Sequence, residues 1–433
     1  MYEISGGFAM TKKGVERDFS LAIQNDRIID MGPSKDIRSK YRFSDSIGSR
    51  SMIISPSFVD AHMHSFQVAT KGLTSDMSLL DWLKRYIWRW EGSLTPKTAR
   101  ACARLSYLEM LKSGVTTFVD YTSVHHTDQA FQAAQEFGMR GNIGKTLMDR
   151  NSPSELQETT DDAIKDTERL IRRFHCSEKG RLKYVITPRF GITCTDELLT
   201  ECKRLSKKHD AMISTHAHEN KGEVHADKKN YKTSAIRHFH KLGLLGPNLL
   251  LAHCIWLDKT EMALLSKTKT NVAHCPGSNM MLASGIADTP KMLEQGMNVG
   301  LGSDMGAYYN LSMFDQMRLS VLIQKTKSFD PNALTHKQAF DFATIGGAKA
   351  VGLGRQTGAL EIGKKADIVL LRTRNTAFSP MNDIVAQLVY SASPACVDTV
   401  ICDGKILMKD KVVLVADEEA IISDSKEILR QAE

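Results

Sequence analysis

The chain lacks the features that mark membrane, secreted and disulfide-rich proteins. No uninterrupted apolar run in its 433 residues approaches a membrane span, for which a helix needs ~20 residues. The first residues, Met1–Ser5, have neither the charged nor the apolar region of a secretory signal. Its eight cysteines include no CxxC pair and show no regular spacing. We therefore expect a cytoplasmic protein with reduced thiols that does not enter a membrane.

A continuous basic surface is also missing. The formal net charge is +7, but the cations stand in short groups interrupted by acids, such as Lys207–Lys208 and Lys228–Lys229. A stripe that could follow a phosphate backbone is absent, so nucleic-acid binding is not expected. With 42% hydrophobic and 25% charged residues, the chain can bury a large core. A homodimer is the expected assembly, because most soluble oligomers are closed and symmetric.

Strand-like runs of apolar and β-branched residues recur along the middle of the chain. The runs are 52–64, 116–121, 141–147, 182–190, 211–216, 249–253, 271–274 and 298–304. Helical patterns lie between most of them, as at 97–113, 159–174, 196–209 and 258–267. Strand and helix alternating in this way predict an α/β fold, a (β/α)8 TIM barrel with a parallel sheet.

The flanks of the barrel differ from it. Residues 1–55 and 366–433 alternate strand-like segments with turn signals, and neither flank is long enough to bury a core alone. We expect the two ends to meet in one small composite β-sandwich domain. The barrel, at 56–365, would be the catalytic domain, and a final helix is predicted at 418–431.

Polar residues stand at the ends of the barrel runs. His62 and His64 are two apart on a strand and therefore project to the same side, while His216, His253 and Asp304 end later strands. Because carboxyl ends of barrel strands meet at one face, these side chains should converge. His62, His64, His216 and Asp304 form a mixed N/O set suited to one divalent ion, zinc or iron. Such an ion would activate a water molecule, with which His253 would form a hydrogen bond.

Four motifs resemble the amidohydrolase superfamily and, within it, the cytosine/guanine deaminase branch. They lie at 54–64, 273–279, 300–304 and 358–367. The resemblance implies one metal held by the four ligands named above, with Asp304 also accepting a proton from the water. It further implies that Glu219 carries protons between water, ring nitrogen and leaving amine. Two-metal relatives place a lysine at the end of strand four, whereas Lys183 lies at the opposite end of that strand here.

Two short motifs resemble guanine deaminases, which implies substrate contacts by Gln67, Arg189 and Phe190. An amide both donates and accepts hydrogen bonds, and an arginine can grip a carbonyl oxygen and a ring nitrogen, as the edges of guanine require. The leading expectation is hydrolysis of guanine to xanthine and ammonia. The segment 68–76 instead resembles S-adenosylhomocysteine and triazine deaminases.

Other functions remain open at this point. The substrate could be another aminated heterocycle: 8-oxoguanine, isoxanthopterin, S-adenosylhomocysteine or methylthioadenosine. A dehalogenating or amide-cleaving hydrolase could use the same ligands, but Glu219 favours an amine leaving group. A non-catalytic scaffold is a distant alternative that the intact ligand set disfavours. His218 shares the alternation of His216, and its role stays open between the loop and the pocket lining.

Overall fold

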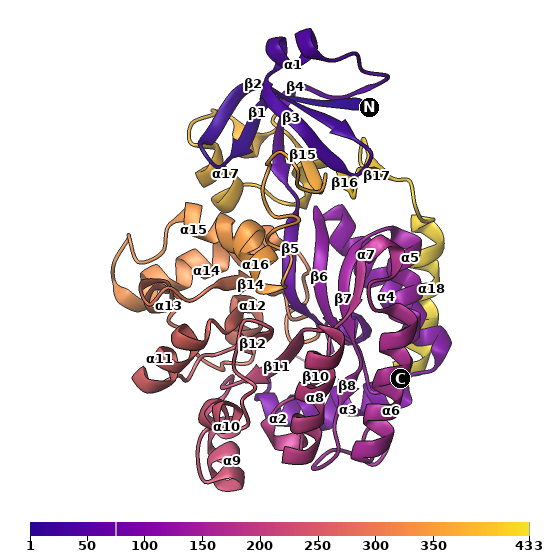
Figure 1. Cartoon of the computed structure of the whole chain (residues 1–433), viewed down its shortest axis with the longest axis vertical. Helices are drawn as coiled ribbons and strands as arrows, with labels where there is room; N and C mark the ends of the chain where they lie inside the picture. Colours follow the sequence, from indigo (N-terminus) through magenta and orange to yellow (C-terminus); the bar gives the residue numbers. More distant parts are fainter. Residues whose placement is uncertain (74–75, 433) are drawn as a thin grey trace.

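The computed structural model describes residues 1–73 and 76–432 and combines a parallel barrel with a separate outer sheet. Figure 1 shows the outer sheet above the barrel, with indigo strands from the N-terminal part of the chain and yellow strands from the C-terminal part side by side. The barrel carries its helices on the outside. The predicted α/β fold class is confirmed.

The barrel strands follow one another in sequence order. They are β5 (Phe58–Met63), β6 (Val115–Tyr121), β7 (Arg140–Gly144), β8 (Thr146–Leu147), β9 (Leu182–Tyr184), β10 (Thr187–Pro188), β11 (Ile213–Ala217), β12 (Leu249–His253), β13 (Asn271–His274) and β14 (Val299–Leu301). Parallel pairing joins β5-β6-β7-β9 and β11-β12-β13-β14. A parallel bridge from Ile186 to Ile213 joins the two halves. The Asp304 N–H donates to the His62 carbonyl at 3.0 Å, which brings the last strand back to the first.

Several predicted strand runs were too long, and the runs 52–64, 141–147 and 182–190 are each divided between two strands. The run 52–64 is divided between β4 (Ser46–Pro56), which belongs to the outer sheet, and β5 of the barrel. The break falls at Ser57, whose N–H donates to the Asp367 carbonyl at 3.1 Å. The run 141–147 breaks at Lys145, whose N–H donates to the side-chain hydroxyl of Tyr184 on β9 at 3.4 Å rather than to a backbone carbonyl. Side-chain periodicity does not reveal such breaks, because remote partners cause them.

The predicted helices agree closely with the structure. They are α4 (Pro96–Lys112), α6 (Thr160–Phe174), α8 (Asp196–His209), α11 (Lys259–Thr268) and the final α18 (Glu418–Ala432). The side chains of Thr95, Thr159, Thr195 and Asp258 accept a backbone N–H and so cap the first four. Helix α18 lies beside α4 (Figure 1) and is tied to it by the Lys112–Glu418 ion pair.

Further helices complete the chain. Around the barrel are α2 (Leu79–Trp82), a π-helical turn (Leu83–Ile87), α3 (Trp88–Ser93), α5 (Thr127–Phe137), α7 (Ser177–Gly180), α9 (Lys221–Tyr231), α10 (Ala235–Lys241), α12 (Pro276–Met281), α13 (Thr289–Glu294), α14 (Met313–Ser328), α15 (His336–Asp341) and α16 (Gly347–Ala350). Short 3-10 turns lie at Ser65–Thr70 and Gly191–Thr193. No helix in the described part of the chain is both long and apolar enough to cross a membrane.

The outer sheet is built from both ends of the chain. Its order is β18-β17-β16-β15-β4-β1-β2-β3, where the strands not yet given are β1 (Tyr2–Thr11), β2 (Gly14–Gln24), β3 (Arg27–Pro33), β15 (Ile368–Arg372), β16 (Val397–Cys402), β17 (Lys405–Lys409) and β18 (Val412–Val413). The helices α1 (Ser34–Lys40) and α17 (Ile384–Tyr390) accompany it. The ends meet where β15 pairs with β4. The boundaries proposed for two domains stay a prediction.

Alternation along β15 fixes the outer sheet to the barrel. Ile368 and Leu370 pack into a core shared by the strands of the outer sheet. Val369 and Leu371, on the opposite face, pack into the large core around the barrel helices. Because successive strand side chains point to opposite faces, one strand contributes to both cores.

A buried ion pair also joins the two parts. Arg140 begins β7 and is 1% exposed; its Nε and Nη2 donate to the Asp367 carboxylate at 2.7 and 3.1 Å, and Nη2 also donates to Asp403 at 2.9 Å. Burial raises the pKa of Asp367, but the guanidinium outweighs it and holds the pKa below its ordinary value. This cluster lies at the amino end of the barrel strand.

Candidate metal centre and active site

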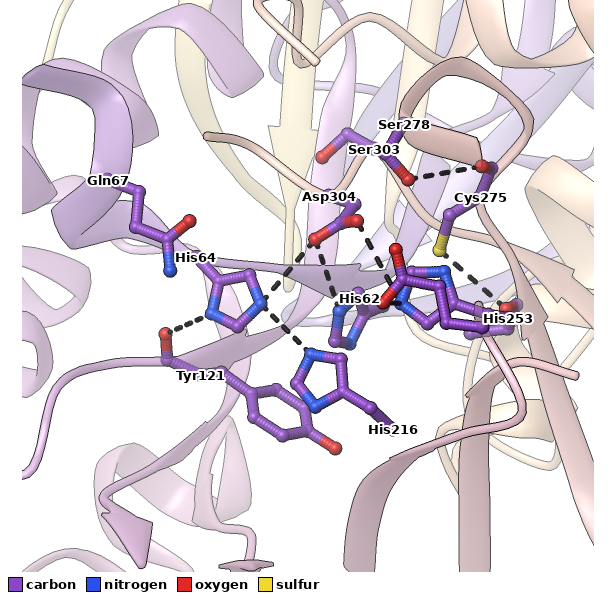
Figure 2. Close-up of polar contacts among 12 residues, drawn as sticks. His62, His64, Gln67, Tyr121, His216, His253, Cys275, Ser278, Ser303 and Asp304 are labelled. Carbon is purple, nitrogen blue, oxygen red and sulfur yellow. Dashed lines mark hydrogen bonds and ion pairs between the residues drawn. The ribbon is translucent and has the colours of Figure 1, made fainter. Parts of the chain in front are cut away.

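Four of the predicted residues converge at the carboxyl ends of the strands. Nε2 of His64 lies 3.2 Å from Nε2 of His216. Oδ1 of Asp304 lies 3.4 Å from Nε2 of His62 and 3.5 Å from Nε2 of His64. Figure 2 shows the three imidazoles gathered about the Asp304 carboxylate. The HxH spacing at the end of β5 thus brings both histidines to His216 on β11 and to Asp304, which follows β14.

Backbone strain accompanies this convergence. Asp304 and His253 adopt left-handed φ angles of 54° and 72°, which are uncommon for residues other than glycine. Buried Asp60 holds the neighbouring backbone, because its Oδ1 accepts the N–H of Ser303 at 3.0 Å and that of His62 at 3.2 Å. Strained conformations of this kind persist where the surrounding structure enforces them, commonly at functional sites.

The imidazoles are oriented by hydrogen bonds at their Nδ1 atoms. Nδ1 of His64 lies 3.1 Å from the Tyr121 carbonyl, and Nδ1 of His216 lies 2.6 Å from the Arg189 carbonyl. Nδ1 of His253 lies 2.9 Å from the Asn279 side-chain oxygen. With Nδ1–H donating to these oxygens, each Nε2 is left as a lone-pair donor at the cluster.

The donor set fits a divalent metal. Both ring nitrogens of His62 and Nε2 of His253 are buried without a hydrogen-bond partner among the described residues. Two overlapping groups, His62/His64/His216 and His62/His253/Asp304, each have ligand atoms within 4.8 Å of one another. Buried nitrogen atoms that lack hydrogen bonds, together with a carboxylate, are the ligands that zinc and iron accept. His253 therefore lies close enough to join the ligands.

The pKa shifts of these side chains also favour metal binding. Burial lowers the pKa of His62, His64 and His216, so these imidazoles are neutral and available as ligands. Burial opposes ionisation of Asp304, but the neighbouring imidazoles, first of all that of His62, outweigh it and lower the pKa of the carboxyl below its ordinary value.

Glu219 stands beside this cluster. Its side chain is buried, with Oε2 3.5 Å from Nε2 of His253, and the Ser284 hydroxyl lies 3.4 Å from Oε1. Burial, followed by the charge of Asp304, raises the pKa of Glu219 well above its ordinary value. A carboxyl in this setting can hold a proton near neutral pH and release it to a nearby group.

A cavity opens over the cluster. Its polar wall is formed by His64, His216, His253, Asp304, Glu219, Glu223 and Arg189, and its apolar wall by Leu79, Trp82, Leu83 and Phe190. The apolar residues from α2 and the π-helical turn come from a segment that the strand pattern did not mark. A cavity with one polar and one apolar wall suits a flat heterocycle that reacts at one edge.

The three predicted substrate contacts separate in the structure. Arg189 and Phe190 line the cavity, but Gln67 does not. Nε2 of Gln67 donates to Oε1 of Glu91 at 2.7 Å, and Nη1 of Arg189 donates to Oε2 of the same carboxylate at 2.6 Å. Sequence reasoning missed Glu91, which is 1% exposed. No local signal marks it, because its partners stand 24 and 98 residues away in the chain.

His218 points away from the cavity. Its φ of 54° turns the chain, and its Nδ1 lies 3.0 Å from the Trp256 carbonyl. It therefore belongs to the loop rather than to the pocket lining. Thr74 and Ser75, within the segment 68–76, lie outside the described residues.

Comparison with known proteins identifies the family. The model of the amidohydrolase family matches residues 53–407, which include the barrel and most of the outer sheet's C-terminal strands. The chain belongs to the amidohydrolase family. The strand ends that carry His62, His64, His216 and Asp304 all fall inside the matched region.

Relatives of this amidohydrolase match over nearly the full length. The 5-methylthioadenosine/S-adenosylhomocysteine deaminase of Desulforudis audaxviator is 33% identical over 429 residues, 99% of this chain and 98% of the relative. The 5'-deoxyadenosine deaminase of Methanosarcina mazei is 33% identical over 408 residues, 94% and 92% of the two chains. The structure of E. coli guanine deaminase superposes with a TM-score of 0.88 at 28% identity, covering 94% of this chain and 100% of that one.

These findings establish this amidohydrolase as an enzyme, a hydrolytic deaminase. The guanine deaminase expected from Gln67 and Arg189 is not confirmed as the specific type, because the two full-length relatives named above are adenosine-type deaminases. The non-catalytic scaffold is thereby set aside.

Proposed function

We propose that this enzyme removes the amine from an adenosine-derived nucleoside, with 5'-deoxyadenosine and 5'-methylthioadenosine as the first candidates. The observation that carries the proposal is a buried carboxyl, Glu219, on the same cavity as the cluster of His62, His64, His216 and Asp304. The names of full-length relatives at 33% identity support the nucleoside. The apolar wall of Leu79, Trp82 and Leu83 supports a substrate that presents an uncharged group there.

The proposed chemistry follows from the positions of the side chains. His62, His64, His216 and Asp304 would hold one zinc or iron ion, with His253 beside it. A divalent ion in this place supplies Lewis acidity that lowers the pKa of water towards neutrality. At the amine-bearing carbon a C–O bond forms and the C–N bond breaks. One proton of the water moves through Glu219 to the ring nitrogen, and the other moves through Asp304 and Glu219 to the amine, which leaves as ammonia.

Guanine is the second candidate. Arg189 and Phe190 line the cavity, as a guanine-binding wall requires, and the similarity to E. coli guanine deaminase supports this substrate. The engagement of Gln67 with Glu91 weighs against it, since the amide that was expected to hold the purine is used elsewhere.

The test is ammonia release by metal-loaded protein from a panel of 5'-deoxyadenosine, 5'-methylthioadenosine, S-adenosylhomocysteine, guanine, 8-oxoguanine and isoxanthopterin. Highest kcat/KM with an adenosine nucleoside supports the proposal, and highest kcat/KM with guanine replaces it by the second candidate. Metal analysis of the purified protein, with chelation and reloading by zinc or iron, tests the ligand set. Activity that survives complete metal removal would overturn it.

A further inference from the structure

The turn from β11 into α9 carries Glu219, and a second buried carboxylate holds that turn. Glu223 is 1% exposed and lies three residues inside α9. Its Oε1 accepts the N–H of His218 at 3.1 Å, and its Oε2 accepts the N–H of Glu219 at 2.7 Å and that of Asn220 at 3.4 Å. Three consecutive backbone donors therefore converge on one side chain.

This convergence exceeds what a helix start requires. In a capping box the N3 side chain accepts one N–H, that of the N-cap residue. Asn220 is the N-cap here, and its side chain completes the box by accepting the N–H of Gly222 at 2.7 Å. The bonds from Glu223 to His218 and Glu219 are additional and reach back towards the metal-ligand strand. They span the left-handed residue His218, whose conformation the turn must maintain.

The same turn is anchored from the opposite side. The His218 carbonyl accepts the N–H groups of Ile255 and Trp256 at 3.0 and 3.1 Å, in the loop that follows β12. The hydrogen bonds to Glu223 and those from the loop after β12 together fix the backbone of Glu219 relative to His253 at the end of β12. Both carboxyls line the cavity, but only that of Glu219 reaches His253.

We propose that Glu223 is a positioning residue for the deamination, acting through Glu219 by holding its backbone N–H and those of its two neighbours. This inference rests on the proposed function, because it requires Glu219 to be the proton carrier. Glu223→Gln keeps the shape but replaces one acceptor oxygen by an NH2 group, which cannot accept a backbone N–H. Displacing a reacting group by about 1 Å can cost roughly 10²-fold in rate.

The experiment measures kcat and KM with 5'-deoxyadenosine for the parent, Glu223→Gln, Glu219→Gln and the double variant, all metal-loaded. We expect Glu223→Gln to lower kcat about 10- to 100-fold with KM nearly unchanged. We expect the double variant to be no slower than Glu219→Gln alone, because Glu223 acts only through that side chain. A further loss in the double variant, or a kcat within about twofold of the parent in Glu223→Gln, overturns the inference.

Two controls separate the failures. Gln338→Ala removes the N3 acceptor of an exposed capping box at Thr335. Neither residue lines the cavity, so kcat should be unchanged. If Glu223→Gln does not fold, Glu223→Asp is measured in the same cycle, with the same criteria. The proposed function is overturned if Glu219→Gln keeps full activity or if the parent turns over no adenosine nucleoside. If Glu219→Gln is inactive but Glu223→Gln remains fully active, this inference alone is overturned.

Discussion

Polar and charged groups are buried at both ends of the barrel strands. At the carboxyl ends several of their atoms lack hydrogen-bond partners, whereas at the amino end they are paired. At the carboxyl ends, both ring nitrogens of His62 and Nε2 of His253 have no hydrogen-bond partner among the described residues, and the backbone of Asp304 is strained. At the amino end, the guanidinium of Arg140 is shared between Asp367 and Asp403. Atoms without partners are available for binding and chemistry, whereas the paired atoms of the Arg140 cluster hold the structure. Stability and activity should therefore respond to different substitutions.

The largest effect is expected from Asp304→Asn at the carboxyl ends. The amide removes the negative charge that faces His62 and His64, so metal affinity and proton acceptance are both lost. We expect kcat/KM to fall by more than about 10³-fold. Steady-state kinetics, metal analysis and urea denaturation of the metal-free protein measure it. A large fall in the free energy of unfolding of the metal-free protein would contradict the expectation that Asp304 serves activity rather than stability.

The converse substitution is Asp367→Asn at the amino end. It leaves the buried Arg140 cation with Asp403 alone, and breaking a buried pair costs about 3 kcal/mol in the free energy of unfolding. Urea denaturation measures the loss, while kcat per folded molecule should stay unchanged. Glu201→Gln is the matched control, since its pair with Arg204 is partly exposed and should contribute less than about 1 kcal/mol.

Glu91→Gln tests whether buried pairing at the active-site end serves binding rather than stability. The neutral amide loses the charge that holds Arg189 against the cavity wall. Loss of a charge-assisted hydrogen bond of about 1.5–3 kcal/mol corresponds to roughly 10- to 100-fold in kcat/KM. Steady-state kinetics on the preferred substrate measure the fall in kcat/KM. If kcat/KM is unchanged and the free energy of unfolding is lowered, the Glu91–Arg189 pair serves stability, as the Arg140 cluster does.

The smallest effect is a pH dependence at the amino end. The pKa of Asp367 is lower in the folded chain than in the unfolded one, so its contribution is complete above the unfolded pKa of about 3.9 and is lost as the pH falls through the folded pKa. The stability difference between the parent and Asp367→Asn should stay constant from about pH 8 to pH 5 and narrow below about pH 4. Denaturation at several pH values measures it, and a gap that narrows above pH 5 would contradict this assignment.

Several features followed from the sequence because they depend on local periodicity. Helices α4, α6, α8 and α11 begin within about one residue of the predicted starts, since cap residues such as Thr195 mark them. The strand ends were also marked, so the convergence of the histidines and Asp304 could be expected before any distance was known. The break in the run 52–64 could not, because Ser57 is held by Asp367, more than 300 residues away.

The sequence by itself determined the barrel and the residues at its carboxyl ends, because strand alternation and barrel topology decide which side chains can meet. The tertiary structure alone decided what surrounds them. It paired Gln67 and Arg189 with Glu91, turned His218 towards Trp256 and placed Glu223 beneath three backbone donors. Most of these partners come from different elements, and the Glu223 contacts depend on a left-handed turn, so only the packed barrel brings them together. Side-chain type and spacing in the sequence do not predict such contacts.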